Sequence, residues 1–326
     1  MKTSLLPILV CPSCRGSLAL RADRREAEEV LDGELSCRCG RGFPVRAGVP
    51  IFVPESYVRS FSFQWHIQKT DSSNEALSAG VKRRFLRAVD RDAGQFSGRR
   101  VLDAGCGRGV LLRLLVDHGA ECIGIDMSDG IEIAASRVQG TALGHAVRCD
   151  ILEPPFPDGS FDAIFSLGVL HHTRDCRGAV LRLARLLRPG GELIIWVYSA
   201  YGRYRNACSD FLRRLTTRMP PRLLYLLCHL AVPLQTLQEI PVLGLPFRLI
   251  PIAGEGPWRW VVLGTFDWYS PRFQSKHTFP EVFRWFEEAG LEGIRVHDWG
   301  IAVSGRAPLQ VSGPVAAAAT TGPPKA

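Results

Sequence analysis

Three acidic residues in the middle of the chain stand at the ends of short apolar stretches that predict β-strands. Asp103 lies at the end of the first stretch, Asp126 ends the second, and Asp150 follows the third. In an open α/β sheet, ligands bind outside the carboxyl ends of the strands. A carboxylate at that edge can accept hydrogen bonds from hydroxyl or amino groups of a ligand. The spacing therefore predicts a ligand site at this edge of the sheet.

A glycine-rich turn follows the first of these acids. Residues 105–109 are Gly-Cys-Gly-Arg-Gly, and Val110 opens a predicted helix with an apolar face. Glycine lets the backbone approach a ligand, and a helix start offers free N–H groups and a positive dipole end. The dinucleotide pattern Gly-x-Gly-x-x-Gly would need glycine at position 110. The turn alone leaves open a dinucleotide site, another nucleoside site, or a bare strand–helix turn.

Four cysteines near the N-terminus are paired as in a metal site. Cys11 and Cys14 form one pair, and Cys37 and Cys39 form the second after a charged, hairpin-like stretch. Four thiolates can hold one zinc ion tetrahedrally, and such a closed site is structural rather than catalytic. A metal would help to fold this stretch, which has few apolar residues. A single residue separates the second pair, where two are commoner, so reduced cysteines without metal are the alternative.

The composition predicts a folded protein of a reducing compartment. The chain has 326 residues and a net charge of +8 that is carried almost wholly by arginine. Its six other cysteines are scattered through apolar or motif contexts, which fits the cytoplasm better than a disulfide framework. Residues 1–10 lack a signal-peptide pattern, and no apolar run reaches the ~18–20 residues of a spanning helix. A basic balance suits nucleic acid, an anionic membrane or an acidic ligand.

The elements that would position these residues alternate between strand and helix. This alternation predicts an α/β fold with a mostly parallel sheet covered by helices on both faces. An amphipathic helix is predicted at 81–95, and another from Pro280 to Ala289 with a capping box formed by Thr278 and Glu281. The predicted strands lie near 99–104, 121–126, 144–149, 160–166 and 191–197, followed by an antiparallel pair at 291–299 and 301–304.

Five ordered motifs resemble class I S-adenosylmethionine (SAM) methyltransferases of the type 11 kind. They are the run 101–109, the acid at 126, the acid at 150, the run 161–172, and the Pro-Gly-Gly turn within 187–195. The resemblance implies a Rossmann-like sheet whose final strand is antiparallel. Residues 1–54 resemble the zinc-ribbon proteins related to the activator subunit of tRNA methyltransferases, through the cysteine pairs and the stretch from Gly40 to Phe52.

The methyltransferase resemblance implies S-adenosyl-L-methionine as the cofactor and gives each motif residue a role. Asp103 would hold the amino group of the cofactor, Asp126 its ribose, and Asp150 with the Ile151 backbone its adenine. The other implied cofactor-binding residues are Gly105, Cys106, Gly107, Met127, Ser166 and Leu167.

Two histidines that follow the fourth strand are the candidate catalytic bases. Near pH 7, a neutral imidazole at His171 or His172 could take a proton from the acceptor. Capping or packing of the next helix is the alternative for this pair. Tyr269 and His277 are outside candidates on a predicted loop.

These features divide the chain into segments. We expect a zinc-ribbon-like domain at 1–54, a connector at 55–80, a methyltransferase domain at 81–306 and a disordered tail at 307–326. A cap-like insertion at 201–264 carries a net charge of +5 together with long aliphatic runs. It could close an apolar acceptor pocket, or it could lie on a membrane surface as a peripheral contact.

The leading function is methyl transfer to a small-molecule or lipid-like acceptor. RNA modification is an alternative, although aliphatic rather than stacking aromatic residues accompany the arginines, so we do not expect a nucleic-acid partner. A non-catalytic partner protein that assembles through its ribbon is the third hypothesis. The sequence predicts no particular oligomeric state.

Overall fold

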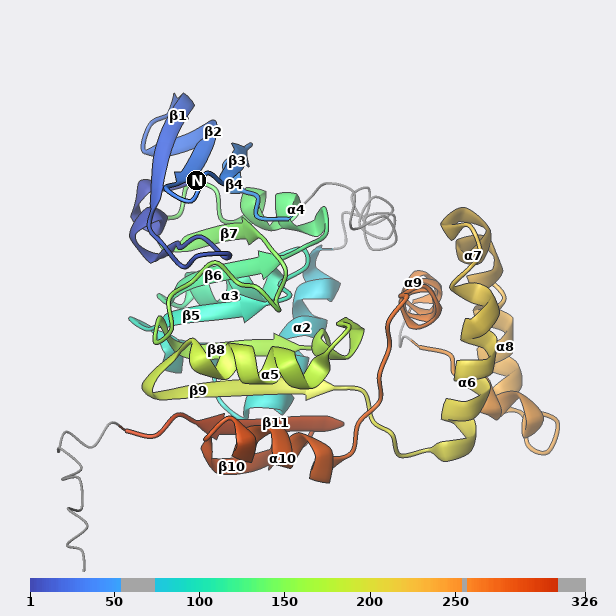
Figure 1. The fold of residues 1–326 in the computed structure, drawn as a ribbon. Coiled ribbons are helices and arrows are strands. Elements are labelled where there is room, and N and C mark those ends of the chain that lie inside the picture. The colour runs from blue at the N-terminus through green and yellow to red at the C-terminus, as the bar shows by residue number, and fades with distance from the viewer. Residues whose placement is uncertain (54–73, 254–256, 310–326) are drawn as a thin grey trace, which may run out of the picture.

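A seven-stranded sheet forms the centre of the computed structural model, which describes residues 1–53, 74–253 and 257–309 (Figure 1). The spatial order is β10-β11-β9-β8-β5-β6-β7, in which β5 to β9 are parallel and β10 and β11 are antiparallel. The strands are β5 (Arg100–Ala104), β6 (Glu121–Asp126), β7 (Gly144–Arg148), β8 (Phe161–Leu167), β9 (Leu187–Val197), β10 (Glu292–His297) and β11 (Ile301–Arg306). The predicted α/β sheet and its antiparallel final pair are confirmed.

Helices cover both faces of this sheet, because successive side chains of a strand point to opposite sides. On β5, Val101 packs with one group of helices and Leu102 with the other. One group is α2 (Asn74–Val89), α3 (Val110–Asp117) and α4 (Gly130–Arg137), and the other is α5 (Cys176–Arg185) and α10 (Phe279–Glu288). The capping box at Thr278 and Glu281 is present at the start of α10.

The helix predicted at 81–95 ends six residues early, at Val89. Asp90 has a φ of +54°, which breaks the helix. The Asp92 carboxylate then accepts a hydrogen bond from the Gly94 N–H at 2.9 Å and starts a separate 3₁₀ turn, η3 (Ala93–Phe96). Aspartate side chains compete with the helix for backbone N–H groups, and the apolar spacing alone did not reveal this competition.

The N-terminal residues form a separate antiparallel sheet that covers the edge strand β7. Its elements are η1 (Thr3–Ile8), β1 (Leu18–Glu26), β2 (Glu29–Cys37), β3 (Gly42–Arg46) and β4 (Val49–Pro50). Ile51 pairs in parallel with Arg148 of β7, and the Phe52 N–H donates to the Arg148 carbonyl at 2.8 Å. The Lys2 ammonium donates to the Gly144 carbonyl at 2.6 Å. These contacts protect an edge whose backbone groups would otherwise lack partners.

The segment predicted as an insertion is helical. It consists of α6 (Arg203–Thr216), α7 (Pro221–Cys228), α8 (Ala231–Glu239), η5 (Pro246–Leu249) and α9 (Trp258–Tyr269). Leu224 and Cys228 of α7 pack against Val262 and Phe266 of α9. In Figure 1, α9 lies between the sheet and α6 to α8, on the side toward which the parallel strands point. Tyr269 ends α9 and is buried, so its prediction as a loop residue was wrong.

Candidate functional site

The glycine turn lies where the strand order reverses. β5 is flanked by β6 on one side and β8 on the other, and in such sheets the ligand crevice opens at this point. The φ angles are +88° at Gly105, +51° at Gly107 and +71° at Gly109, in the region that glycine adopts without strain. The turn therefore depends on glycine at three alternate positions.

Packing within the protein is a second reason why glycine is needed at two of these positions. A Cβ atom at position 105 would overlap with the Val169 side chain, and one at position 109 would lie 2.7 Å from the Cβ of Ala134. From the sequence, only the approach of a ligand was expected to require glycine here. At these two positions the neighbouring protein atoms already exclude a side chain.

Asp126 holds the glycine turn in place from the end of β6. Its Oδ2 accepts a hydrogen bond from the Gly107 N–H at 2.9 Å, and its Oδ1 accepts from the Ser128 N–H at 2.8 Å and the Ser128 hydroxyl at 2.6 Å. Burial raises the pKa of Asp126, and these hydrogen bonds oppose the shift. A carboxylate can accept about four hydrogen bonds, so capacity for a ligand hydroxyl is left.

Asp103 is a buried acid on β5 beside this turn. It is 5% exposed, and its Oδ2 has no hydrogen-bond partner within the part of the chain that the structure describes. Burial, with a smaller contribution from the charge of Asp126, raises the pKa of Asp103 to about 7. An ionised carboxylate in such a place is costly unless a cation or donor meets it.

Four other predicted cofactor-binding residues make mainly structural contacts. The Ser166 hydroxyl donates to the Ala104 carbonyl at 2.8 Å and joins β8 to β5, and Leu167 packs in the core on the same side as Cys106. The Met127 carbonyl accepts a hydrogen bond from Arg148 Nε at 3.1 Å. All four lie at or just after the carboxyl ends of β5, β6 and β8.

Asp150 and Ile151 follow β7 at the same edge of the sheet. The Asp150 carboxylate accepts a hydrogen bond from the Leu152 N–H at 2.9 Å, which closes a local turn. Ile151 is buried. The cofactor role of this pair stays a prediction.

The histidine pair lies on η4 (Leu170–His172), just beyond β8. His171 is fully buried and stacks on Tyr198 with 3.7 Å between ring centroids. The Nδ1 atom of His172 lies 3.1 Å from the Phe273 carbonyl, so it donates and Nε2 is the basic nitrogen. Burial lowers the pKa of both histidines, and both rings are therefore neutral near pH 7.

Two aromatic residues extend this group and were missed in the sequence. Tyr198 follows β9 directly and stacks on Trp268 of α9, with 4.7 Å between ring centroids. Tyr198 could have been found from the sequence, because it directly follows a predicted strand at the edge where the ligand is expected. Trp268 gave no such signal, because its place depends on how α9 packs against the sheet.

The chain after α9 fixes the insertion over the histidine pair. The Ser275 N–H donates to the His171 carbonyl, and the His277 N–H donates to the Tyr198 carbonyl, both at 2.8 Å. The His277 ring nitrogen Nε2 lies 2.7 Å from the Ser275 hydroxyl. These bonds place the end of the insertion against the carboxyl ends of β8 and β9.

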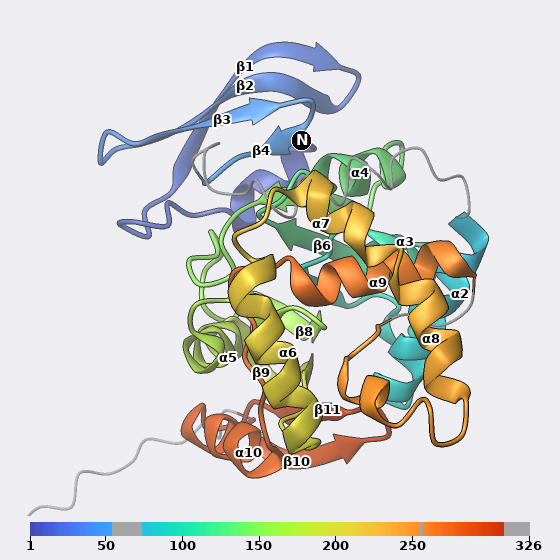
Figure 2. The ribbon, with the colours of Figure 1, turned by 90° about the vertical axis from the view of Figure 1, so that its right-hand side faces the viewer.

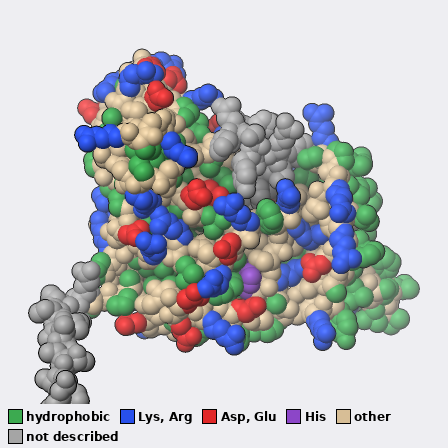
Figure 3. Space-filling view, viewed as in Figure 1, with side chains coloured by type: hydrophobic (Ala, Val, Ile, Leu, Met, Phe, Trp, Pro, Cys, Tyr) green, Lys and Arg blue, Asp and Glu red, His purple; other side chains and the backbone are tan. Residues whose placement is uncertain are grey.

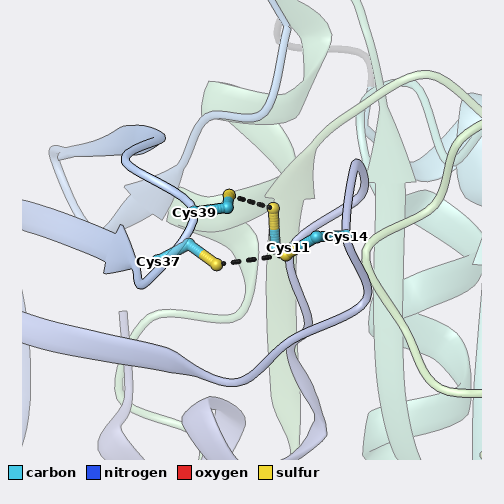
Figure 4. A group of neighbouring side chains, drawn as sticks. All are labelled: Cys11, Cys14, Cys37 and Cys39. Atoms are coloured by element: carbon cyan, nitrogen blue, oxygen red, sulfur yellow. Dashed lines mark hydrogen bonds between the residues drawn. The ribbon is translucent and has the colours of Figure 1, made fainter.

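The four N-terminal cysteines converge. Their sulfur atoms all lie within 4.8 Å of one another, with 3.8 Å between Cys11 and Cys39 and 3.3 Å between Cys14 and Cys37. Figure 4 shows the side chains pointing toward one another from two chain segments. Tetrahedral zinc with Zn–S bonds of about 2.3 Å places its sulfurs about 3.8 Å apart. The single residue between Cys37 and Cys39 therefore does not prevent a shared site.

Comparison with known proteins identifies both parts of the chain. Residues 102–195 match the family model described as a methyltransferase domain, and residues 2–48 match the model described as a Trm112p-like protein. The chain joins a Trm112p-like domain to a methyltransferase domain. Both resemblances seen in the sequence are confirmed.

The relatives of the methyltransferase domain include proteins with different acceptors in their names. A demethylmenaquinone methyltransferase of Renibacterium salmoninarum is 30% identical over 148 residues, which cover 45% of this chain and 62% of that protein. The tRNA (carboxymethyluridine(34)-5-O)-methyltransferase ALKBH8 of Mus musculus is 40% identical over 132 residues, which cover 40% of this chain and 18% of that protein. The chain thus spans less than two thirds of these relatives.

One chain of a solved complex between the Haloferax volcanii Trm112 methyltransferase activator and a methyltransferase is also similar to this chain, with 18% identity and a TM-score of 0.42, covering 72% of this chain and 93% of that one.

The side chains of the methyltransferase domain fit SAM in their chemistry. The SAM amino group is a cation, and the buried Asp103 Oδ2 is an anionic oxygen without a hydrogen-bond partner among the described residues. An ammonium at this position would offset the cost of the buried charge. Asp126 keeps capacity for a ribose hydroxyl, as shown above.

Asp103 makes the stability of the ligand-free protein depend on pH. Its pKa is about 7 in the fold against 3.8 in an unfolded chain, so the folded state binds the extra proton between these values. Stability from this group is present at low pH and is lost as pH rises toward 7. As pH rises from 5 to 8, the free energy of unfolding of the wild type should fall by about 3 kcal/mol relative to that of Asp103→Asn. Urea unfolding of both proteins at each pH checks this; parallel stability curves would contradict it.

Proposed function

We propose that this chain is a SAM-dependent methyltransferase that acts on a small-molecule or lipid-like acceptor. The proposal rests on the buried Asp103 Oδ2, which has no hydrogen-bond partner among the residues described. This oxygen lies beside a glycine turn that Asp126 holds at the reversal of the strand order. The methyltransferase family match over residues 102–195 supports it.

Each predicted residue has a place in the proposed site. Asp103 binds the amino group of the cofactor, and the turn of Gly105, Cys106 and Gly107 lies along its methionine portion. Asp126 and Met127 meet the ribose. The adenine contacts Asp150 and Ile151, and Ser166 and Leu167 line the end of β8.

The protein supplies orientation and exclusion of water. SAM carries an activated methyl group on a sulfonium, so transfer needs an acceptor atom held in line and a site with little water. The helical insertion covers the side of the sheet from which an acceptor would enter, and the segment that follows it donates backbone hydrogen bonds to the carbonyls of His171 and Tyr198. We place the acceptor between the end of β8 and α9.

His172 is the better placed of the two candidate bases. Its Nδ1 donates to the Phe273 carbonyl, which fixes the tautomer in which Nε2 can take a proton. His171 is fully buried and stacked on Tyr198, which suits a packing role. The aromatic rings of Tyr198 and Trp268 next to this pair favour an apolar or planar acceptor.

Zinc bound by Cys11, Cys14, Cys37 and Cys39 would be structural, because four thiolates complete its coordination. The small sheet that these cysteines hold lies against β7, the edge strand that is followed by the proposed adenine contacts. We infer that the metal stabilises the domain that covers this edge.

The acceptor class is tested by labelling. Purified protein is incubated with methyl-deuterated SAM and with separate lipid, small-molecule and RNA fractions of a cell extract, and the products are identified by mass spectrometry. We expect the label in the lipid or small-molecule fraction. Label in RNA alone would favour the function named for the ALKBH8 relative, and no label in any fraction would contradict the enzyme proposal. With the labelled acceptor in hand, His172→Gln should slow transfer if Nε2 takes a proton.

A further inference from the structure

Helix α6 buries two polar side chains and leaves three large apolar ones exposed. Ser209 and Arg213 are its buried residues. The Ser209 hydroxyl accepts a hydrogen bond from the Trp268 indole at 2.8 Å, and the Arg213 guanidinium donates to the carbonyls of Trp268 and Pro271, each at 2.6 Å. A surface helix of a globular protein normally buries its apolar stripe instead. The inversion indicates that something apolar meets the outer side.

The outward stripe of α6 is continuous. Tyr204, Phe211 and Leu215 are 81%, 63% and 57% exposed, and their spacing of seven and four residues puts them on one face of the helix. Such a row of large apolar side chains in water is costly for a protein with no partner there.

The exposed apolar surface continues over the neighbouring helices and the loop that follows them. We define the outer apolar face as the large apolar side chains of 201–258 that are exposed, namely Tyr201, Tyr204, Phe211, Leu215, Leu223, Leu226, Leu227, Leu230, Ile240, Val242, Leu243, Leu245, Leu249 and Trp258. Figure 2 views α6, α7 and α8 from this side, and in Figure 3 hydrophobic side chains gather at the right-hand edge over these helices. Most of the exposed large apolar residues of the described chain belong to this face.

Arginines accompany the outer apolar face. Arg203, Arg214, Arg218 and Arg222 are exposed, and none of them forms an ion pair with any residue that the structure describes. Basic side chains line the border of the hydrophobic region in Figure 3. The acid Asp210 of α6 is already paired with Lys276. The surface therefore combines aliphatic side chains with unneutralised positive charge.

We propose that the outer apolar face docks this protein on an anionic lipid membrane. Aliphatic side chains would enter the boundary between headgroups and acyl chains, and the arginines would meet lipid phosphates. None of the helices that the structure describes has the length and apolar character needed to span a bilayer, so the contact would lie in the interface. This inference does not depend on methyl transfer.

The chemistry of the outer apolar face favours an anionic membrane over a second copy of the chain or a nucleic acid as its partner. A second copy of the chain would bring the same unpaired arginines face to face, and like charges oppose such a contact. Nucleic acid would meet the arginines, but ten of the fourteen side chains of the outer apolar face are aliphatic, which offers bases few rings to stack on. An anionic bilayer satisfies both the charge and the aliphatic surface.

Co-sedimentation of the full chain with vesicles tests the proposal. We expect binding to vesicles of phosphatidylcholine mixed with phosphatidylglycerol, weak binding to phosphatidylcholine alone, and weaker binding to the anionic vesicles at high salt. The double variant Phe211→Ser/Leu226→Ser should bind anionic vesicles at least about tenfold more weakly, because it loses apolar area from the interface. Arg214→Gln/Arg218→Gln/Arg222→Gln should lose the preference for anionic lipid.

Matched controls carry the same substitutions elsewhere. Leu309→Ser removes an apolar side chain that is 76% exposed outside the outer apolar face, and Arg284→Gln removes an exposed arginine of α10. Both should bind vesicles as the wild type does. Equal binding by the double variant and the wild type, or no binding to either vesicle, would overturn the proposal. A dimer of the wild type in solution that the Phe211→Ser substitution dissociates would also overturn the proposal. Circular dichroism of each variant separates these outcomes from misfolding.

Discussion

Replacing Cys37 with serine is expected to remove zinc from the protein and to unfold the N-terminal sheet. The four sulfur atoms lie within 4.8 Å of one another, and structural zinc supplies about 10–16 kcal/mol to the fold that holds it. The core of this small sheet, around Val30, Leu35 and Val45, is too small to replace that contribution. Elemental analysis should find one zinc per wild-type chain and almost none in the variant. Hydrogen exchange should show lost protection in β1 and β2.

A second cysteine provides the control for this experiment. Cys208 of α6 is half-buried and far from the cluster in sequence, so Cys208→Ser should keep the metal and the protection. If the wild-type protein purified under reducing conditions contains no zinc, the cluster is a set of reduced cysteines. Unchanged protection in Cys37→Ser would lead to the same conclusion.

Asp126→Ala is expected to weaken SAM binding by about 30-fold or more, because truncating one partner of a buried, charged hydrogen bond costs about 2–5 kcal/mol. The variant loses the proposed ribose contact and also the acceptor that holds the Gly107 N–H and Ser128. The measurement is the rise in melting temperature with added SAM. At 100 times the wild-type dissociation constant, SAM should add about 2.7 kcal/mol to the stability of the wild type and at most about 1 kcal/mol to that of the variant.

Two variants separate binding from folding in that experiment. Asp126→Asn keeps an acceptor oxygen but loses the charge, so it should bind SAM with intermediate affinity. Asp117→Ala removes an exposed acid at the end of α3 whose partner is Arg113, and it should respond to SAM as the wild type does. A full SAM-dependent stabilisation of Asp126→Ala would mean that the acid does not contribute to the site.

The sheet could be predicted because its signals are local. Each parallel strand is a short apolar stretch, and an acid or glycine stands at or within two residues of the end of β5, β6, β7 and β8. The capping box at Thr278 and the metal spacing of the cysteines are local patterns in the same sense. Each such pattern specifies its structure without knowledge of distant residues.

The parts that could not be predicted depend on contacts between distant segments. Arg213 looked like part of a solvated basic surface, yet it is buried because its partners are carbonyls 55 and 58 residues later in the chain. Val169 fills the space at Gly105 across a loop, and Trp268 reaches Tyr198 only when α9 has packed. The composition predicted a cap-like insertion at 201–264 but not which of its side chains face water.

Calorimetric titration of the full chain with SAM, in reducing buffer, tests the central claim most directly. The proposed site at the carboxyl ends of β5, β6 and β7 predicts saturable binding of one SAM molecule per chain. It also predicts that binding weakens as pH falls below 7, because Asp103, with a pKa of about 7, must lose its proton to hold the amino group. The absence of saturable binding at pH 8 by a folded protein would contradict the account.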